Sequence, residues 1–491
     1  MSTPNTARNF ATRPFSDPDV IVIGSGMGGL TTAGILSMYG MKVMVLEQHD
    51  TPGGSMHHFK QGTEWVSAGW HYVGRPNKMF RSVWNYLTNN QPYTNDPDEI
   101  YDTNWGVGSM TGNTVENVMG IKLKDMRRVE GAFTFLLLVK LLPKPLAWIV
   151  WLVFRLTGKY REATMNYGEW CKKVTGEKVE KDIWWTQRGD HGVPRSKTCA
   201  LLGVGVVAHY KNGVIHPQGG PRETVMRMVQ TISNNGGCVL LKAPVRDILT
   251  ENNKVVGVEV DGVRIPCMKV IVTGAEPIHR LMKDRAPKGI QEAMAELGPS
   301  VTHGAIFLTF TGKSRLDLDM PPGNIWYQER MFISTKESPT GTVVYILWEM
   351  PYVPRGAGYE EAKDNAATEA MNIAQELFPK IKHYNEFDAA TPATTEFYLD
   401  AWNGCSYGLN APTERFNSFR MVRNLRPKQD VEGLYLTGQD MMLAGVMGAM
   451  VAGVFCAQAV RYPGLSGIWN NVFKDLDRLL KKQKKGAKAS A

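Results

Sequence analysis

Near the start of the chain, glycines are spaced as in loops that bind the phosphates of a dinucleotide. Gly24, Gly26 and Gly29 form a G-x-G-x-x-G pattern directly after an apolar run at residues 20–23. In such loops the first glycine permits a tight turn, the second lets the backbone approach a pyrophosphate, and the third lets a helix pack closely on a strand. The phosphates bind at the N-terminus of that helix, where free N–H groups and the helix dipole favour negative charge.

A strand, a helix and a second strand must hold this loop. The sequence predicts the first strand at residues 20–23, the helix at 30–39 and the second strand at 42–46. Glu47 ends the second strand, where a carboxylate can accept hydrogen bonds from ribose hydroxyls. The pattern alone does not distinguish NAD from FAD. The glycine doublet at residues 53–54 follows, and this order resembles the glutathione-reductase type of FAD fold.

Two later segments suit the same nucleotide fold. A helix with an apolar face is predicted after residues 217–223, followed by strands at residues 239–241, 245–249, 255–260 and 270–273. Near the C-terminus, residues 433–440 indicate a strand that ends in a polar turn. Gly445 then begins an apolar helix that runs to Val460. Its glycine turn and helix start can hold an anion or a flavin carbonyl.

Five motifs together resemble the retinol saturase branch of the carotenoid isomerase and phytoene desaturase family, whose members are FAD-dependent oxidoreductases. In chain order the motifs are residues 53–59, 69–74, 216–220, 405–409 with 414–416, and 434–440. The resemblance covers residues 18–460. The sequence departs from the family at His216, where an aromatic residue commonly precedes the proline. It also departs at its start, which lacks the hydrophobic signal or anchor of animal retinol saturases.

The residues and the resemblance together lead us to expect an α/β fold with a discontinuous, Rossmann-like FAD-binding part, an inserted α+β substrate domain and a membrane-dipping helical segment. The chain is expected to begin with a disordered leader at 1–18 and to end with a basic amphipathic tail at 466–491. The FAD-binding parts are expected at 19–80, 201–280 and 426–465. Between them lie a substrate and membrane-associating part at 81–200, with its apolar dipping segment at 131–157, and a substrate domain at 281–425.

The implied cofactor is noncovalent FAD, with NAD(P)H as a candidate external electron donor. Gly203 and Gly205 lack the third glycine and the strand–helix context of a second dinucleotide loop, so no dedicated NAD(P) domain is expected. The residues expected to bind FAD come from the glycine loops, the ribose acid and the strand ends: Gly24, Ser25, Gly26, Met27, Gly28, Gly29, Glu47, Gln48, Gly53, Gly54, Ser55, Met56, Val245, Gly274, Gly438, Asp440, Gly445 and Val446.

The implied substrate is a hydrophobic isoprenoid, a retinoid or a carotenoid, taken from a membrane through an apolar tunnel. The leading hypothesis is saturation of one of its conjugated C=C bonds. A second is a redox-neutral transformation such as cis–trans isomerisation, in which reduced flavin is needed but not consumed; desaturation is a further enzymatic variant. A third, from another class, is a flavin-bound lipid-binding protein without turnover. Because these functions share a fold and a cofactor, the sequence does not choose between them.

Saturation needs a hydride from the flavin and a proton from a nearby acid. His71 and Tyr72 are the candidate catalytic residues, and His57 and His58 come next. A lone histidine is more often a packing residue than an acid, and that alternative stays open for each of them. Glu414 and Arg415 are expected to form a buried ion pair.

The formal net charge of +9 is concentrated in two segments, at residues 122–161 and 474–488, so a nucleic-acid partner is not expected. Both segments adjoin apolar sequence. The runs at 133–139 and 146–154 are too short to cross a bilayer, which needs about 20 apolar residues in a helix. Tryptophans and flanking cations favour an in-plane position at the lipid headgroups. The alternative is a buried helix pair.

The C-terminal stretch at residues 468–485 is either a second anchor or a solvated tail. We expect a monotopic association with a membrane of the endoplasmic reticulum or a plastid. Residues 1–18 contain no apolar run, so no secretory signal peptide is expected. The six cysteines are at least 28 residues apart, which excludes zinc ribbons, iron–sulfur clusters and a dense disulfide framework. No metal site is expected, and no motif supports a hydrolytic triad.

Overall fold

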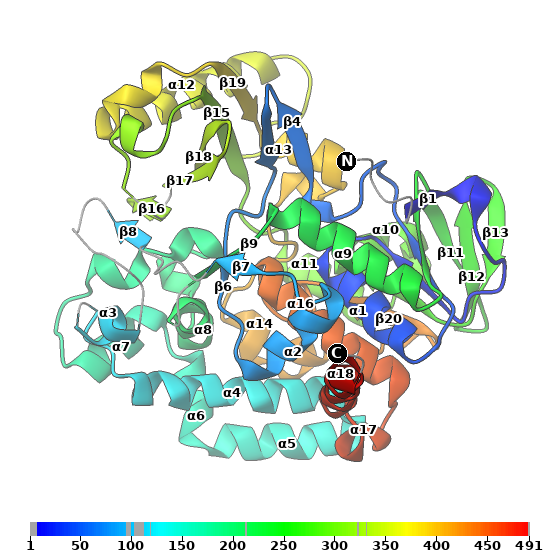
Figure 1. Ribbon diagram of the computed structural model, residues 1–491. Coiled ribbons are helices and arrows are strands. Elements are labelled where there is room, and N and C mark those ends of the chain that lie inside the picture. The colour runs from blue at the N-terminus through cyan, green and yellow to red at the C-terminus, as the bar shows by residue number, and fades with distance from the viewer. Residues whose placement is uncertain are drawn as a thin grey trace.

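The computed structural model describes residues 7–94, 100–102, 112–117, 119–211, 214–321, 324–329 and 331–489. Figure 1 shows a parallel sheet with its helices on the right, a second sheet at the upper left, and a group of helices at the lower left and along the bottom.

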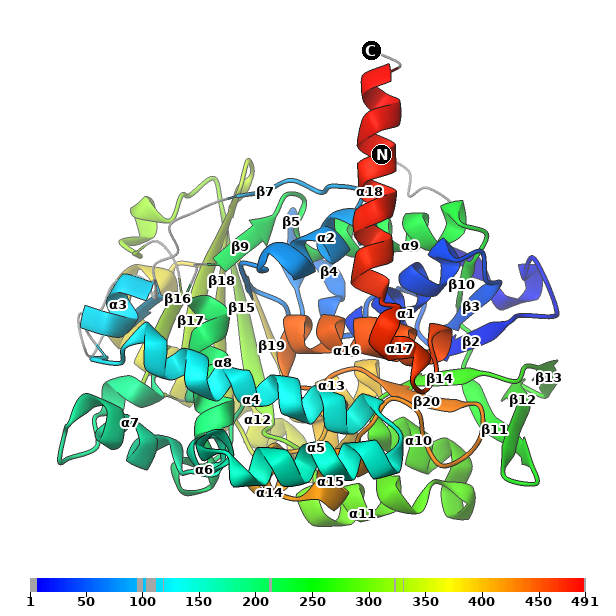
Figure 2. The ribbon, with the colours of Figure 1, turned by 90° about the horizontal axis from the view of Figure 1, so that it is seen from below.

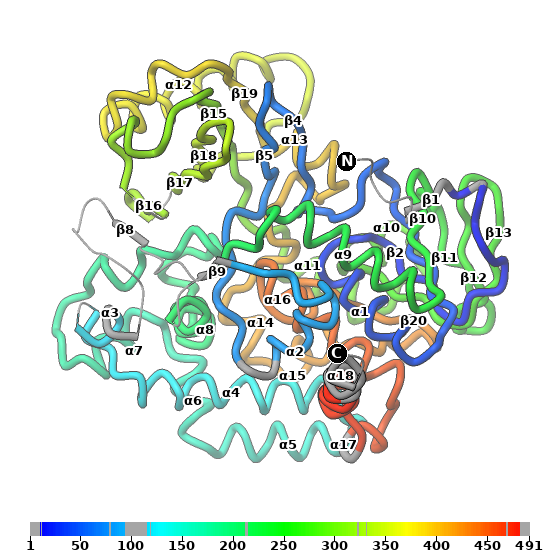
Figure 3. The backbone as a smooth tube through the Cα atoms, viewed as in Figure 1, coloured from blue at the N-terminus to red at the C-terminus, as the bar shows by residue number. Residues whose placement is uncertain are grey.

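The parallel sheet has six strands in the order β1-β10-β3-β2-β14-β20. Neighbouring strands come from distant parts of the chain, and the tube in Figure 3 shows blue, green and orange segments meeting in this region. The inner strands are apolar except for Thr273 at the end of β14, as expected for a parallel sheet covered on both faces. The strands are β1 (Ala7–Asn9), β2 (Val20–Ile23), β3 (Val43–Leu46), β10 (Cys238–Leu241), β14 (Val270–Thr273) and β20 (Leu434–Thr437).

Alternate residues of these strands belong to two different cores. One face packs against α1 (Met27–Met38), α9 (Gly220–Asn234) and α16 (Gly445–Arg461). The other face packs against helix α10 (Ala275–Met282) and a small antiparallel sheet of β11 (Val245–Glu251), β12 (Lys254–Val260) and β13 (Val263–Pro266). This is the FAD-binding, Rossmann-like α/β arrangement that the sequence predicts, and its strands come from three separate stretches of the chain.

Helix α1 begins at Met27, three residues before the predicted start. Its first turn therefore contains Gly28 and Gly29, and neither position has room for a side chain. A Cβ atom on Gly28 would come within 2.7 Å of the Cα atom of Gly438, and one on Gly29 would come within 2.2 Å of the carbonyl oxygen of Gly24. Close packing of α1 on the glycine loop thus depends on residues without side chains.

The prediction of a disordered leader is wrong for residues 7–18. Ala7–Asn9 forms β1, which pairs in parallel with β10, and Phe10 and Phe15 pack against the core. An extended segment gains hydrogen bonds by pairing with the open edge of a sheet, and this gain needs no particular side-chain pattern. Residues 1–6 lie outside the described part of the chain.

The second large sheet is mixed, with the order β19-β15-β18-β17-β16-β8. Helix α12 (Tyr359–Leu377) packs against its core. Its strands are β8 (Ile100–Asp102), β15 (His303–Thr311), β16 (Asn324–Tyr327), β17 (Met331–Ser338), β18 (Gly341–Glu349) and β19 (Glu386–Ala390). The domain boundaries given above remain a proposal, although this sheet draws most of its strands from the predicted substrate domain.

The apolar segment near residue 140 forms a helical hairpin of α4 (Leu123–Leu141) and α5 (Lys144–Leu156). Figure 1 shows α5 at the lower edge of the molecule, and Figure 2 shows both helices from below. Within the described residues, no helix is both long and apolar enough to cross a membrane. Helix α8 (Ala200–Tyr210) packs beside α4 and contains Gly203 and Gly205, which therefore form no nucleotide loop.

The two faces of α5 differ sharply in exposure. Ala147, Trp151 and Phe154 point into the core. The opposite face exposes 37–80% of six large apolar side chains, which we call the α5 apolar face: Leu146, Trp148, Ile149, Leu152, Val153 and Leu156. An exposed apolar patch of this kind is typical of a protein or membrane contact.

The chain ends in helix α18 (Val472–Ala489), which projects from the body of the molecule in Figure 2. Its first turns pack against α2 (Lys78–Leu87), because Val472 and Leu476 are fully buried there. The ring of Phe473 meets the rings of Phe80 and Phe455 edge-on. The beginning of the predicted tail is thus part of the packed structure.

Candidate functional site

A groove of about 320 Å³ runs along the carboxyl ends of the parallel strands. Seventeen of the eighteen residues predicted to bind FAD line this groove; the exception, Gly29, is used for helix packing. The groove is where ligands bind in open α/β sheets, because the strand order reverses there. Binding by each of these residues remains a proposal, but the fold brings them to one place from four separate regions of the sequence.

Ser25 connects the glycine loop to the ribose acid. Its backbone N–H and its hydroxyl both donate to Glu47 Oε2, at 2.9 and 2.5 Å, and its Oγ accepts from the N–H of Gly53 at 3.0 Å. Glu47 Oε1 accepts from the N–H of His49. The carboxylate is 8% exposed, so it is held in one orientation at the edge of the groove.

The glycine loop fits the pyrophosphate of a dinucleotide. Gly26 is the N-cap of α1, with φ −66° and ψ 174°, and no atom lies within 4 Å of where its Cβ would be. A side chain there would stand in the groove rather than in the core. The N–H groups of the first turn of α1 face this space, which is the arrangement that binds phosphate.

Asp440 connects separate segments of the groove through hydrogen bonds. Its carboxylate accepts hydrogen bonds from the N–H groups of Ala275 and Leu409, both at 2.7 Å. It thereby joins the ends of β14 and β20 to the segment at residues 405–409.

The prediction of a buried Glu414–Arg415 ion pair is wrong. Arg415 is 4% exposed, but Glu414 lies on the surface. The guanidinium group of Arg415 instead donates to four backbone carbonyls, those of Leu409, Asn410, Gln439 and Asp440, at 2.7–3.2 Å. Sequential residues of a helix do not face one another, which is why the pair does not form.

Replacing Arg415 with methionine is expected to lower the free energy of unfolding by about 3 kcal/mol, since each buried carbonyl left without a donor costs about 1–3 kcal/mol. Chemical denaturation followed by circular dichroism measures this. Arg420→Met is the control, because Arg420 pairs with Glu292 and Glu296 on the surface, where such pairs contribute about 1 kcal/mol or less. Equal losses in both variants would contradict the role given to Arg415.

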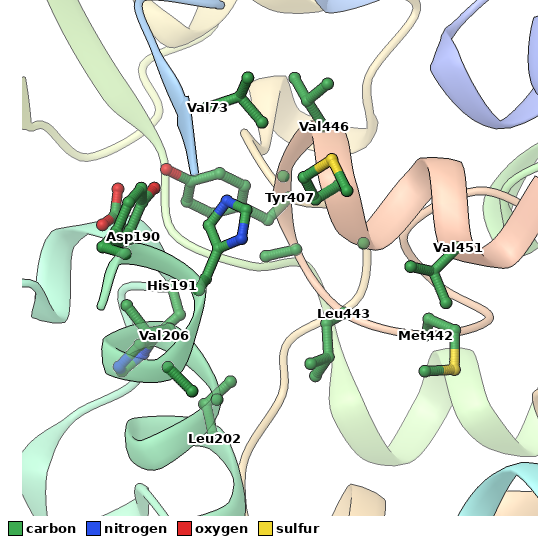
Figure 4. Close-up of a pocket in the computed structure, with 18 of the residues that line it drawn as sticks. Val73, Asp190, His191, Leu202, Val206, Tyr407, Met442, Leu443, Val446 and Val451 are labelled. Atoms are coloured by element: carbon green, nitrogen blue, oxygen red, sulfur yellow. The ribbon is translucent and has the colours of Figure 1, made fainter. Parts of the chain in front are cut away.

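A second, larger cavity of about 630 Å³ adjoins the groove. Gly69, Tyr407, Gly445 and Val446 border both spaces. Figure 4 shows the cavity, with Asp190, His191 and Tyr407 near one end and Leu443, Met442 and Val451 farther along. A cofactor bound in the groove would border the cavity at these four residues.

Most of the cavity wall is apolar. The apolar side chains come from α2, α4, α8 and α16 and from the loop before α16, and include Phe80, Phe133, Leu137, Leu202, Val206, Leu443, Met447, Val451 and Phe455. A cavity of this size and lining is typical of a site for an apolar small molecule.

One end of the cavity is polar. Asp190 ends the short helix η4 (Arg188–Asp190), and its carboxyl oxygens accept from the hydroxyl of Tyr72 at 3.3 and 3.4 Å. Burial raises the pKa of Asp190 to about 7, although hydrogen bonds from Tyr72 and Tyr210 lower it. Burial also raises the pKa of both tyrosines well above the usual value, so both hydroxyls stay protonated.

The histidines of the cavity are neutral. Burial lowers the pKa of His71 and His191 to about 3, and that of His209 and His303 to about 4. Neither ring nitrogen of His71 has a hydrogen-bond partner.

The structure places both predicted catalytic residues, His71 and Tyr72, in the cavity wall, and their catalytic role remains a prediction. His57 lines the groove instead. His58 lies in strand β4 (His58–Gln61), and burial lowers its pKa to about 3. A neutral imidazole is a weak acid, which argues against His71 as the proton donor.

Several polar residues of the cavity were not predicted as site residues, among them Asp190, Tyr210 and Tyr407. The sequence around Asp190, Arg188-Gly-Asp-His191, carries no periodic pattern and no known motif. Its neighbours at residues 186–192 are polar residues and glycines, so no local signal marked Asp190.

The comparisons with known proteins agree with this geometry. The family described as "Flavin containing amine oxidoreductase" matches residues 27–461. A curated relative from Danio rerio named all-trans-retinol 13,14-reductase is 28% identical over 92% of this chain and 87% of its own length. Prolycopene isomerase 1, chloroplastic, from an Oncidium hybrid cultivar is 24% identical over 90% of this chain and 83% of its own.

Among solved structures, wild-type putrescine oxidase bound to putrescine superposes with a TM-score of 0.62 at 17% sequence identity. The superposition covers 91% of this chain and 99% of the oxidase. At this identity the likeness extends to the fold, which is the α/β arrangement described above.

Proposed function

Because the chain belongs to the family of flavin-containing amine oxidoreductases, we propose that it is an FAD-dependent reductase that saturates a conjugated C=C bond of a retinoid or carotenoid. Its cofactor is FAD. When bound and reduced, FAD supplies a hydride to one carbon of the double bond. The residues of the chain orient the polyene, exclude water and deliver the proton.

The observation that carries the proposal is the junction of the groove and the apolar cavity at Gly69, Tyr407, Gly445 and Val446. A cofactor in the groove meets an apolar substrate at that junction and nowhere else along the described cavity wall. The relatives named for retinol reduction and prolycopene isomerisation support a polyene as the substrate.

The test is anaerobic incubation of the chemically reduced protein with a panel of retinoids and carotenoids. Flavin absorbance and product mass are followed together. We expect one equivalent of flavin to be oxidised per polyene consumed, with a product two mass units heavier. A panel that leaves the flavin reduced and every mass and isomer unchanged would overturn the proposal.

An isomerase is the second candidate, and the similarity to prolycopene isomerase favours it. In the same experiment an isomerase gives a product of unchanged mass while the flavin stays reduced. A lipid-binding protein without turnover, the third hypothesis, would retain the polyene unaltered. NAD(P)H is the proposed source of reducing equivalents; stopped-flow mixing with oxidised enzyme measures whether it reduces the flavin.

We also propose that the chain associates with one leaflet of a membrane through the α5 apolar face. Exposed Lys144, Arg155 and Lys159 flank this face, and cations in such positions are attracted to anionic headgroups. Phe133 and Leu137 of the adjoining helix α4 line the cavity, so the same hairpin borders the substrate site. Membranes of the endoplasmic reticulum or plastids are the proposed location.

A further inference from the structure

Two carboxyl groups line the cavity in the described part of the chain, and their surroundings differ. Glu130 forms an ion pair with Lys211 at 2.6 Å, so a cation balances the charge of its carboxylate. Asp190 meets hydroxyl groups instead, and among the described residues no lysine or arginine lies within ion-pair distance of it. Asp190 is partly buried, and it lines the cavity.

The helix that carries Asp190 is fixed in place. Arg188 donates from Nε to Glu329 at 3.0 Å and from an Nη atom to Glu349 at 2.7 Å, which ties the turn to the second sheet. Gly189 lies so close to the ring of Trp326 that a Cβ atom would come within 2.3 Å of it. A catalytic group needs this kind of support to hold its position.

Asp190 also lies beside the junction with the groove. The hydroxyl of Tyr407, which borders both spaces, donates to the carbonyl of Gly189 at 3.4 Å. Figure 4 shows the Tyr407 ring between Asp190 and Val446. The Asp190 carboxyl group therefore lies next to a residue of the junction, within the cavity that an apolar substrate would fill.

We propose that Asp190, held by Tyr72 and Tyr210, is the acid that protonates the polyene. The inference rests on the proposed reductase function. One carbon of the double bond accepts a hydride, with its two electrons, from the reduced flavin. The π-electron pair forms the new C–H bond at the other carbon with the proton from the Asp190 carboxyl oxygen. The carboxylate regains a proton from solvent, and the flavin is left oxidised by two electrons.

The acid–base properties of the cavity support this assignment. With a pKa near 7, Asp190 is substantially protonated at neutral pH, whereas the four cavity histidines are neutral and the tyrosines are much weaker acids. An acid is most effective when its pKa lies near the working pH. Tyr72 is then a positioning residue, because its hydroxyl holds the carboxyl group.

The first test does not depend on turnover. Infrared spectroscopy of the oxidised holoprotein is expected to show the C=O band of a protonated carboxylic acid, which disappears with a midpoint near pH 7. The band should be absent from Asp190→Asn and present in the control Glu162→Gln, whose carboxylate pairs with Arg128 and Lys173 outside the cavity. Retention of the full band in Asp190→Asn would overturn the assignment.

The second test follows oxidation of the reduced flavin by a retinoid in a single turnover. In the wild type the rate should fall as pH rises through about 7, because the protonated form is lost. Asp190→Asn should be slower by about 100-fold or more, with a flat pH profile and an unchanged dissociation constant for the retinoid. Asp190→Glu should recover part of the rate. Asparagine is neutral at every pH, so it suits a buried site and should preserve the fold.

The two proposals fail in different ways. If the wild type oxidises its flavin with a polyene and Asp190→Asn does so equally fast, the role of Asp190 is wrong and the reductase function stands. If no polyene oxidises the wild-type flavin, the reductase function is wrong, and the role of Asp190 as its acid falls with it.

Discussion

Replacing Gly26 with aspartate is expected to give a folded protein that retains no FAD. A Cβ atom on residue 26 would have no neighbour within 4 Å, so the substitution leaves the packing of the core unchanged. The carboxylate would stand at the N-terminus of α1, where it occupies the space of the pyrophosphate and repels its charge. Purified Gly26→Asp should show the circular dichroism of the wild type and no flavin absorbance.

Gly158→Asp is the matched control for this experiment. Gly158 also begins a helix, α6 (Gly158–Thr164), and its Cβ position is likewise open. Gly158 does not line the groove, so Gly158→Asp should bind FAD in full. A Gly26→Asp protein as yellow as the wild type would show that the pyrophosphate lies elsewhere.

Placing charges on the α5 apolar face is expected to abolish membrane binding. The side chains of Trp148, Ile149 and Leu152 are 43–55% exposed, so changing all three to glutamate leaves the core intact. Each loses a contribution of about 1.5 kcal/mol or more from transfer of a large apolar side chain. Together they should weaken binding to phosphatidylcholine–phosphatidylserine vesicles by at least about 100-fold in a flotation assay.

Three exposed apolar residues elsewhere provide the control: Val179→Glu, Met268→Glu and Leu316→Glu, in one protein. These side chains are 61–75% exposed and lie away from α5. The control should bind vesicles as the wild type does, and both triple variants should keep FAD. Unchanged flotation of the α5 variant would place the membrane contact elsewhere, with α18 as the next candidate. Deleting the whole hairpin would be uninformative, because Trp151 and Phe154 belong to the core.

The nucleotide-binding part was predictable because its signals are local. An apolar run, three spaced glycines and a terminal acid specify β2, α1 and β3 to within three residues, since each element is defined by a few adjacent positions. The same holds for β14 and for β20 with α16. The resemblance supplied what local patterns do not, namely that these pieces belong to one sheet.

The cavity chemistry was not predictable in the same way. Burial raises the pKa of Asp190, and hydrogen bonds from Tyr72 and Tyr210 lower it; these residues meet only in the folded chain. The same holds for His71, because burial in the folded chain lowers its pKa and leaves it a neutral imidazole. Strand β1 was missed because edge pairing uses backbone groups that every sequence has.

The contact between α1 and α16 has a consequence for biosynthesis. Cβ atoms on Gly28 and Gly453 would collide with Gly438 and with the backbone of Gly28, so the start of the chain and its last tenth fit together without space between them. During translation the β14 edge stays unpaired until β20 leaves the ribosome. A nascent chain therefore cannot capture its cofactor until synthesis is nearly finished, and until then it exposes an apolar sheet edge of the kind that chaperones protect.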